Sequence, residues 1–280
     1  MFSAFETAPC HCFTATDIAT ILRDNHAGWE LPQTFGPGQL ISFLTDVGRL
    51  REVVLKSDFG DIRRFVWGDA SPYSIALSLR PGAYLSHASA MFLHGLADEE
   101  PRVIYVNKEQ SPKPPPRGGL TQQALDRAFQ NSQRASKYVY DFDSYQAVIL
   151  NGKHSDRLEV GQEPAPKNTG ELIDVTKIER TLIDIAVRPA YAGGVKQVLA
   201  AFQHAKERMS VETLIATLKR LEYVYPYHQA IGFYMERAGY EPAKLALLKQ
   251  FGLKHDFYLA HGLKDLIYDA TWRLHRPKDL

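Results

Sequence analysis

The chain has 280 residues, 45% of them hydrophobic and 23% charged, so it exceeds the common size of one domain and can bury a substantial core. Its 33 basic and 32 acidic residues nearly cancel, which excludes a globally basic nucleic-acid binder and leaves only a local basic patch. The sequence has no apolar run of about 18 residues and no signal peptide at its start, so we expect a cytoplasmic protein with no membrane partner.

Both cysteines lie near the start, Cys10 and Cys12, on either side of His11. A one-residue gap differs from the two-to-four-residue spacing that is typical of zinc ligands, and no second ligand pair completes the set. We therefore expect two reduced thiols, with no metal and no cofactor.

Residues 13–50 predict two helices separated by a break. Apolar residues at helical spacing indicate the first helix within residues 13–22, with Thr16 as its N-cap. Glycines and prolines interrupt residues 23–38, and helical spacing then resumes until Gly48. We expect the second helix to bury one apolar face, formed by Leu40, Phe43, Leu44 and Val47.

Two strands follow, at residues 51–57 and 62–68, joined by the turn SDFGD. Helix, turn, helix and hairpin in this order are typical of a winged helix-turn-helix. We assign residues 1–69 to such a DNA-binding domain.

The second helix of a helix-turn-helix enters the major groove, where polar side chains meet base edges. Gln39, Ser42 and Thr45 are spaced three apart on the face opposite the apolar one, and they are the predicted base contacts. The residues predicted to meet DNA phosphates are Arg49, Arg51, Lys56, Arg63 and Arg64. Residues 1–69 nevertheless hold nine acidic and only six basic side chains, which leaves open a winged helix that contacts protein instead.

Residues 70–280 are predicted to form one larger domain, with a candidate sub-boundary near residue 168. Its first part mixes short helices with strands at 102–106 and on both sides of a turn at 141–144. Residues 111–119 and 159–170 are expected to be loops, because proline removes hydrogen-bond donors. A short strand at 171–175 precedes helices at 177–189, 194–208, 210–224, 227–239 and 241–252. The predicted fold class is α+β, with a mixed α/β, mainly helical C-terminal domain.

His87 and His94 stand seven positions apart on a predicted helix, which Ser86 is expected to cap. That spacing separates them by about 10.5 Å along the helix axis, whereas two zinc ligands from one helix need a spacing of four. The two histidines therefore cannot share a metal, and we expect each to be a hydrogen-bonded core residue.

An enzyme is not indicated, because the sequence lacks the common phosphate-loop, dinucleotide, metalloprotease and hydrolase motifs. One alternative is a metal-dependent nuclease that uses Glu171, Asp174 and Lys177. Strand geometry argues against it, since Asp174 and Lys177 are three apart and point to opposite faces. A second alternative is a protein-interaction module that neutralises a toxin directly, without binding DNA.

Several motifs occur in a distinctive order. RRFVWG (63–68) closes the hairpin, YLSHASAMFLHGL (84–96) is followed by PRVIYV, and IDVTKIERTLIDIAVRP (173–189) precedes a glycine pair. A helical region ending near Trp272 completes the chain. This order resembles the AbiEi-type antitoxins of type IV toxin–antitoxin, or abortive-infection, systems, over nearly the whole length.

The resemblance implies a non-enzymatic antitoxin that represses its own operon. The N-terminal domain would bind inverted repeats in the operator DNA upstream of that operon. The C-terminal domain would counteract a nucleotidyltransferase-like toxin, generally without a stable complex. The residues that match the family motifs, and that we expect to be structural or interface-forming, are Ser86, His87, His94, Gly95, Glu179, Arg180 and Asp184.

Within the second of these motifs, Arg180 and Asp184 stand four apart on a helix and are expected to form an ion pair. The chain departs from the family in two features: the insert NHAGWELPQTFGPG (25–38) between its first two helices, and an acidic N-terminal domain.

Overall fold

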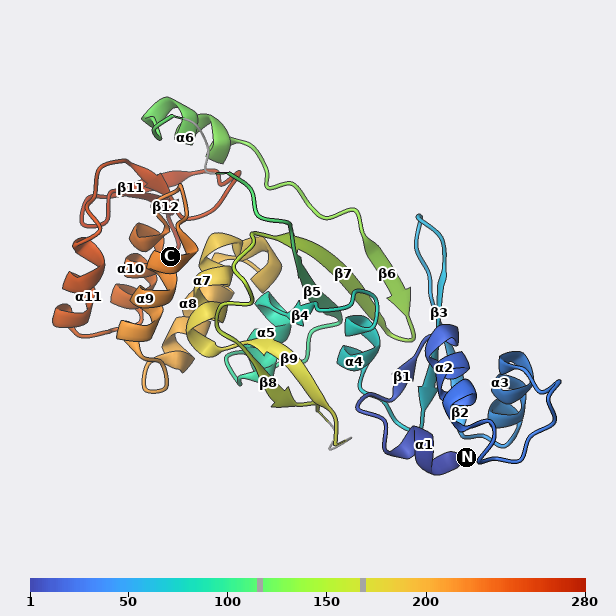
Figure 1. The fold of residues 1–280 in the computed structure, drawn as a ribbon. Coiled ribbons are helices and arrows are strands. Elements are labelled where there is room, and N and C mark those ends of the chain that lie inside the picture. The colour runs from blue at the N-terminus through green and yellow to red at the C-terminus, as the bar shows by residue number, and fades with distance from the viewer. Residues whose placement is uncertain (115–117, 167–169) are drawn as a thin grey trace.

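The computed structural model describes residues 1–114, 118–166 and 170–280. The fold is mixed α/β, as predicted, with eleven α-helices and three β-sheets in the described residues. Figure 1 shows the N-terminal elements at one end, a six-stranded sheet in the middle and most of the helices at the other end. None of the helices in these ranges is both long enough and apolar enough to cross a membrane.

The N-terminal part packs three helices on a small sheet. Its antiparallel strands run in the order β1-β3-β2. The elements are α1 (Phe2–Glu6), β1 (Cys12–Phe13), α2 (Ala15–Asn25), α3 (Pro37–Asp46), β2 (Leu50–Leu55) and β3 (Ile62–Trp67). Helix α2 is capped by Thr14 and not by Thr16, because the Thr14 hydroxyl accepts from the backbone N–H of Asp17, whose carboxylate accepts from the Thr14 N–H in return.

The hairpin β2–β3 has two buried faces. Side chains alternate along a strand, so Phe65 and Trp67 join a core with Leu40 and Leu44 of α3, while Val66 faces the opposite way. On that opposite face, a second hydrophobic cluster combines hairpin residues with residues after position 69: Val53, Leu55 and Val66 with Tyr73, Ile75 and Leu79. The N-terminal part and the rest of the chain therefore share a core across the expected boundary.

The central sheet has the strand order β6-β7-β5-β4-β9-β8. The pairs β5·β7 and β4·β9 are parallel, and the other neighbours are antiparallel. The strands are β4 (Tyr84–Leu85), β5 (Val103–Glu109), β6 (Val139–Phe142), β7 (Tyr145–Gly152), β8 (Val160–Pro164) and β9 (Leu172–Thr176). Strand β8 lies where a loop was expected, because its backbone pairs with β9. Of the two expected loops, positions 115–117 and 167–169 lie outside the described residues.

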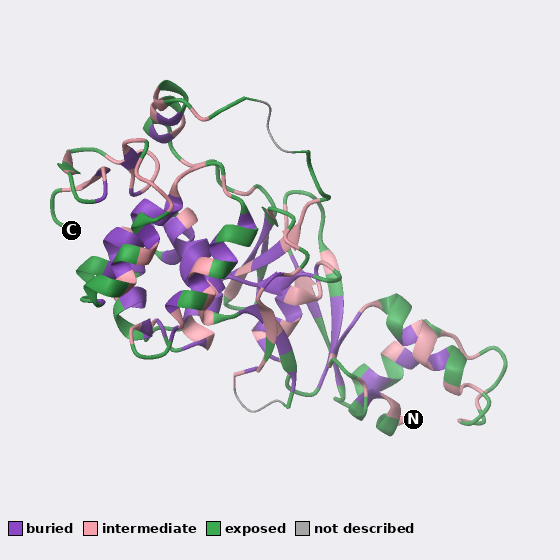
Figure 2. Cartoon of the chain, turned by 60° about the vertical axis from the view of Figure 1, so that its left-hand side comes forward, coloured by how far each residue is buried: buried purple, intermediate pink, exposed green. Residues whose placement is uncertain are grey.

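Helices cover this sheet and fill the far end of the molecule, where Figure 2 shows their inward faces buried. A small sheet near the C-terminus, in the strand order β10-β12-β11, was not predicted. The remaining elements are α4 (Pro72–Leu77), α5 (His87–Leu93), α6 (Gln122–Gln130), α7 (Ile178–Val187), the 3-10 helix η1 (Pro189–Ala192), α8 (Val195–Ala205), α9 (Val211–Leu221), α10 (Tyr227–Arg237), α11 (Pro242–Lys249), β10 (Phe257–Tyr258), β11 (Leu266–Asp269) and β12 (Leu274–Pro277).

Trp272 anchors the small sheet to α10. Its side chain is fully buried, and its indole N–H donates to Glu236 at 3.1 Å. A Cβ added to Gly232 of α10 would overlap the six-membered ring of Trp272, so the helix keeps glycine where the indole crosses it. The ring packs against the backbone itself.

We expect Gly232→Ala to lower the free energy of unfolding by about 1–3 kcal/mol, because the added methyl overpacks a rigid contact. Gly38→Ala in α3 is the matched control: a Cβ added there would have no other atom within 4 Å, so its effect should be neutral or slightly stabilising. Urea denaturation followed by circular dichroism measures both. Equal stability of the two variants would contradict the packing role of Gly232.

Candidate nucleic-acid interface

The three residues predicted to contact bases lie together on α3. Gln39, Ser42 and Thr45 are all exposed. The backbone N–H of Gly36 donates to Oε1 of Gln39 at 2.8 Å, which caps the start of the helix. Only the side-chain NH2 of Gln39 is then left to meet a ligand, so it can act as a donor but cannot form a bidentate contact without breaking the cap.

The same helix departs from the expected apolar face. Leu40 and Leu44 are fully buried, but Phe43 and Val47 are 43% and 45% exposed. Side chains from the sheet and α1, among them Phe5, Phe13 and Trp67, fill the small N-terminal core. Of the apolar residues of α3, only Leu40 and Leu44 are buried in it. Helix α3 therefore presents apolar as well as polar groups to solvent.

The cations predicted to meet phosphates differ in their surroundings. Arg49 follows α3, is exposed, and has its guanidinium 5.7 Å from the centre of the Phe2 ring. Arg63 is 72% exposed and pairs with Glu52 at 3.4 Å. Arg51 pairs at 3.2 Å with Asp143 of the body, the name used here for residues 70–280. These exposed pairs are weak, so a phosphate could compete for Arg63 or Arg51.

Arg64 is not placed to meet DNA. It is 9% exposed and lies on the hairpin face that packs on the body. Its guanidinium donates to the carbonyl of Ser78 at 2.8 Å, to the Ser78 hydroxyl at 3.0 Å and to the carbonyl of Arg63 at 2.8 Å. Strand alternation was the available signal, since adjacent Arg63 and Arg64 must point to opposite faces.

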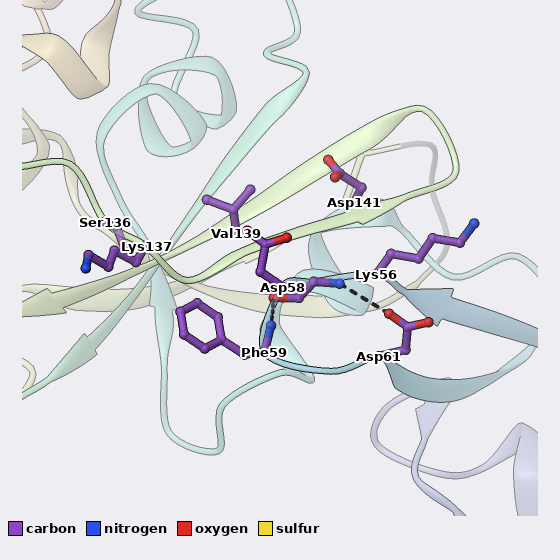
Figure 3. A pocket seen from close by; sticks show the side chains of 9 residues that line it. Lys56, Asp58, Phe59, Asp61, Ser136, Lys137, Val139 and Asp141 are labelled. Atoms are coloured by element: carbon purple, nitrogen blue, oxygen red, sulfur yellow. Dashed lines mark hydrogen bonds between the residues drawn. The ribbon is translucent and has the colours of Figure 1, made fainter.

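The hairpin turn is held against the body and is not free in solvent. The backbones of Lys56 and Asp141 exchange two hydrogen bonds, of 2.8 and 2.9 Å, and the Phe59 ring lies 5.1 Å from that of Tyr138. Figure 3 shows the open pocket between the turn and β6. Its charged lining residues are Lys56, Lys137, Asp58, Asp61 and Asp141, a mixed set with an acidic excess. The predicted contact Lys56 thus sits beside carboxylates.

Ser86 and His87 open α5. Instead of capping the helix, the Ser86 hydroxyl lies 2.8 Å from Nδ1 of His87, whose ring packs edge-on against Tyr191. Burial, reinforced by Arg188 and Arg180, lowers the pKa of His87 to about 3, so the imidazole is neutral at neutral pH. Its backbone φ of 54° is left-handed, which is uncommon for a residue other than glycine.

Other residues of the family motifs also form contacts inside the protein. His94 is buried, with Nε2 2.6 Å from the carbonyl of Thr176, and Gly95 ends α5 with a φ of 62°. Glu179 accepts from the backbone N–H of Ser210 at 2.8 Å and thereby joins α7 to the start of α9. Each of these contacts connects separate elements of the body.

Arg180 and Asp184 form a buried ion pair on α7, with Nε and Oδ1 2.9 Å apart. Arg180 also donates to the Leu158 carbonyl and the Ser155 hydroxyl. Burial raises the pKa of Asp184, against the opposing effect of Arg180. Sequence reasoning missed the neighbouring Glu109, which accepts from the Tyr84 hydroxyl at 2.9 Å and from Ser155, because nothing local in the sequence pairs these distant segments.

The three candidate nuclease residues have different partners. Glu171 is buried and accepts from the Ser71 N–H and the Ser74 hydroxyl. Asp174 and Lys177 pair with other side chains, Arg157 at 2.7 Å and Glu159 at 3.0 Å respectively. Residues 1–114, 118–166 and 170–280 contain no group of three or more His, Cys, Asp or Glu arranged to hold a metal ion. Both cysteines are free thiols, and burial raises the pKa of Cys12 to about 11.

We expect Arg64→Ala to lower the free energy of unfolding by about 2–3 kcal/mol, because it removes charged donors from carbonyls at a buried junction. Arg63→Ala, at the adjacent but exposed position, should change it by about 0.5 kcal/mol or less. Chemical denaturation of the two variants measures the difference. Comparable losses in both would mean that Arg64 does not join the hairpin to the body.

The lowered pKa of His87 predicts a pH dependence. Between about pH 6.5 and pH 3 the unfolded chain binds a proton at His87 that the folded chain does not, so acidification through this range lowers the free energy of unfolding. His87→Asn, in which asparagine tolerates the left-handed backbone, should make this decline shallower. Urea midpoints at about pH 7 and about pH 5 measure the slope. An unchanged slope in the variant would show that His87 does not contribute.

Neither a protein-family model nor a curated protein matches this sequence. The fold is similar to the crystal structure of the RV2827C protein from Mycobacterium tuberculosis, with a TM-score of 0.58 and 17% sequence identity. The similarity covers 98% of this chain and 88% of that one. At this identity the two chains share a fold across almost the whole length described above.

Proposed function

We propose that this protein is a DNA-binding transcriptional autorepressor and antitoxin of a type IV toxin–antitoxin system, in which residues 1–69 act as a winged helix-turn-helix. The observation that carries the proposal is the exposed face of α3, where Gln39, Ser42 and Thr45 stand together beside an antiparallel hairpin. Such a helix supplies donors and acceptors to base edges in the major groove.

In this proposal the β2–β3 hairpin is the wing, and it makes fewer phosphate contacts than its number of arginines and lysines suggests. Arg49 after α3 and Arg63 on β3 are the main phosphate contacts, with Arg51 as a further candidate, because Arg64 is bound inside the protein. The acidic residues of the hairpin turn keep that end away from the phosphates. Base-edge contacts and two or three cations then share the binding energy.

The partners follow from the same proposal. The DNA is an operator with inverted repeats upstream of the protein's own operon, and the protein acts in the cytoplasm. Residues 70–280 are the antitoxin domain that opposes a nucleotidyltransferase-like toxin. The buried ion pair of Arg180 with Asp184 and the half-buried contact of Glu179 support a scaffolding role for the family motifs.

A second candidate function is a protein-interaction module that neutralises the toxin directly. One observation favours it: Arg51 and Arg63 of the hairpin are already paired with carboxylates, so the hairpin adds little net positive potential.

Binding of the upstream DNA at a series of salt concentrations tests the first function. Arg49→Ala and Arg63→Ala should each weaken binding and reduce the slope of log K against log salt by about 0.9, the value for one phosphate contact. The matched control is Arg220→Ala, an exposed arginine on α9 of the body, which should leave affinity and slope unchanged.

A stable complex with the toxin, together with no mobility shift of upstream DNA, would contradict autorepression and support the second function. DNA binding with unchanged affinity and slope in both variants would instead contradict the assigned contacts.

A further inference from the structure

The exposed face of α3 carries an apolar row whose purpose the protein's own packing does not explain. Phe43 and Val47 are four positions apart, one helical turn, and Gln39 precedes them by another turn. Both apolar side chains remain more than two-fifths exposed, although the core begins on the same helix at Leu40 and Leu44. The row thus begins beside Gln39, one of the proposed base contacts, and ends at Val47, the residue that follows α3.

The major groove presents one apolar group that this row could contact, the methyl group of thymine. Among the four bases, only thymine presents a methyl group there, next to its O4 acceptor. A phenylalanine ring can pack on that methyl, and the free NH2 of Gln39 can donate to an acceptor such as O4. Of the proposed base contacts, Gln39 borders the row, whereas Ser42 and Thr45 lie further round the helix. The polar amide of Gln39 makes a purely apolar occupant a poor match.

Charge distinguishes DNA from a protein partner. Arg49 lies two positions after Val47, is exposed, and makes no ion pair with any side chain that the structure describes. An unneutralised guanidinium at the end of a narrow apolar row matches a base methyl flanked by a backbone phosphate. Figure 1 shows α3 at the end of the molecule that faces away from the body, where a duplex can approach it.

We propose that Phe43 and Val47 are specificity-determining residues that read thymine methyl groups, so that each operator half-site contains thymine under α3. This inference rests on the proposed DNA-binding function and goes beyond it, since it names the base that is read and the residues that read it.

Replacing thymine by uracil removes only the methyl group, and this substitution tests the inference. Duplexes enriched by the full-length protein from a random pool are prepared with either thymine or uracil, and their affinities are compared by fluorescence anisotropy. We expect uracil to weaken binding about fourfold for each methyl that the row contacts, the effect of exposing one carbon group. Phe43→Ala and Val47→Ala should bind the two duplexes with nearly equal affinity.

Val224→Ala is the matched control, because Val224 is also exposed, at 51%, but lies in the body beyond α9. It should keep the full preference for thymine.

Each other outcome overturns the inference in a distinguishable way. Equal affinity of the wild-type protein for both duplexes would overturn the thymine reading while the DNA-binding function stands. Failure to enrich any duplex would overturn both. If Phe43→Ala dissociates a dimer in solution and leaves the thymine preference intact, the row is an interface between two copies of the chain.

Discussion

The β2–β3 hairpin, with apolar side chains on both of its faces, is the constraint on which the arrangement of this molecule depends. A hairpin of a free DNA-binding domain needs only one buried face. Here Phe65 and Trp67 close the N-terminal core, and Val66, between them, enters the core of the body. Arg64 extends the second contact with hydrogen bonds to Ser78. The orientation of α3 relative to the body is therefore set by packing and not by a linker.

Much of this fold could be predicted from the sequence. The helices of residues 170–252 follow from apolar residues at helical spacing, because this signal is local. The β2–β3 strands and the β6–β7 turn were found for the same reason. The small C-terminal sheet was missed because β10 has only two residues and pairs in parallel with a distant strand. Strand β8 was missed because its residues have weak strand propensity and its pairing with β9 decides its conformation.

The candidate interface could be predicted only in part. The polar row of Gln39, Ser42 and Thr45 followed from periodicity. The exposure of Phe43 and Val47 did not, because periodicity predicts which residues share a face and not how much of that face a small core can cover. For Arg64 the local pattern is sufficient, because strand alternation places it on the face opposite Arg63. The partners of Glu109 and Glu171 come from distant segments and have no local signal.

The shared hairpin has a consequence for how proteins of this build diverge. Substitutions on the solvent side of α3 alter no contact between residues 1–69 and the body, so under the proposed function operator preference can change one residue at a time. The hairpin has no such freedom, since a replacement at Val66 or Arg64 must suit two neighbours at once. A replacement for residues 1–69 taken from another protein would pack here only if its hairpin carried the same inward side chains. Under the proposed function, DNA recognition can therefore change through single side chains of α3 but not by exchange of the whole N-terminal part.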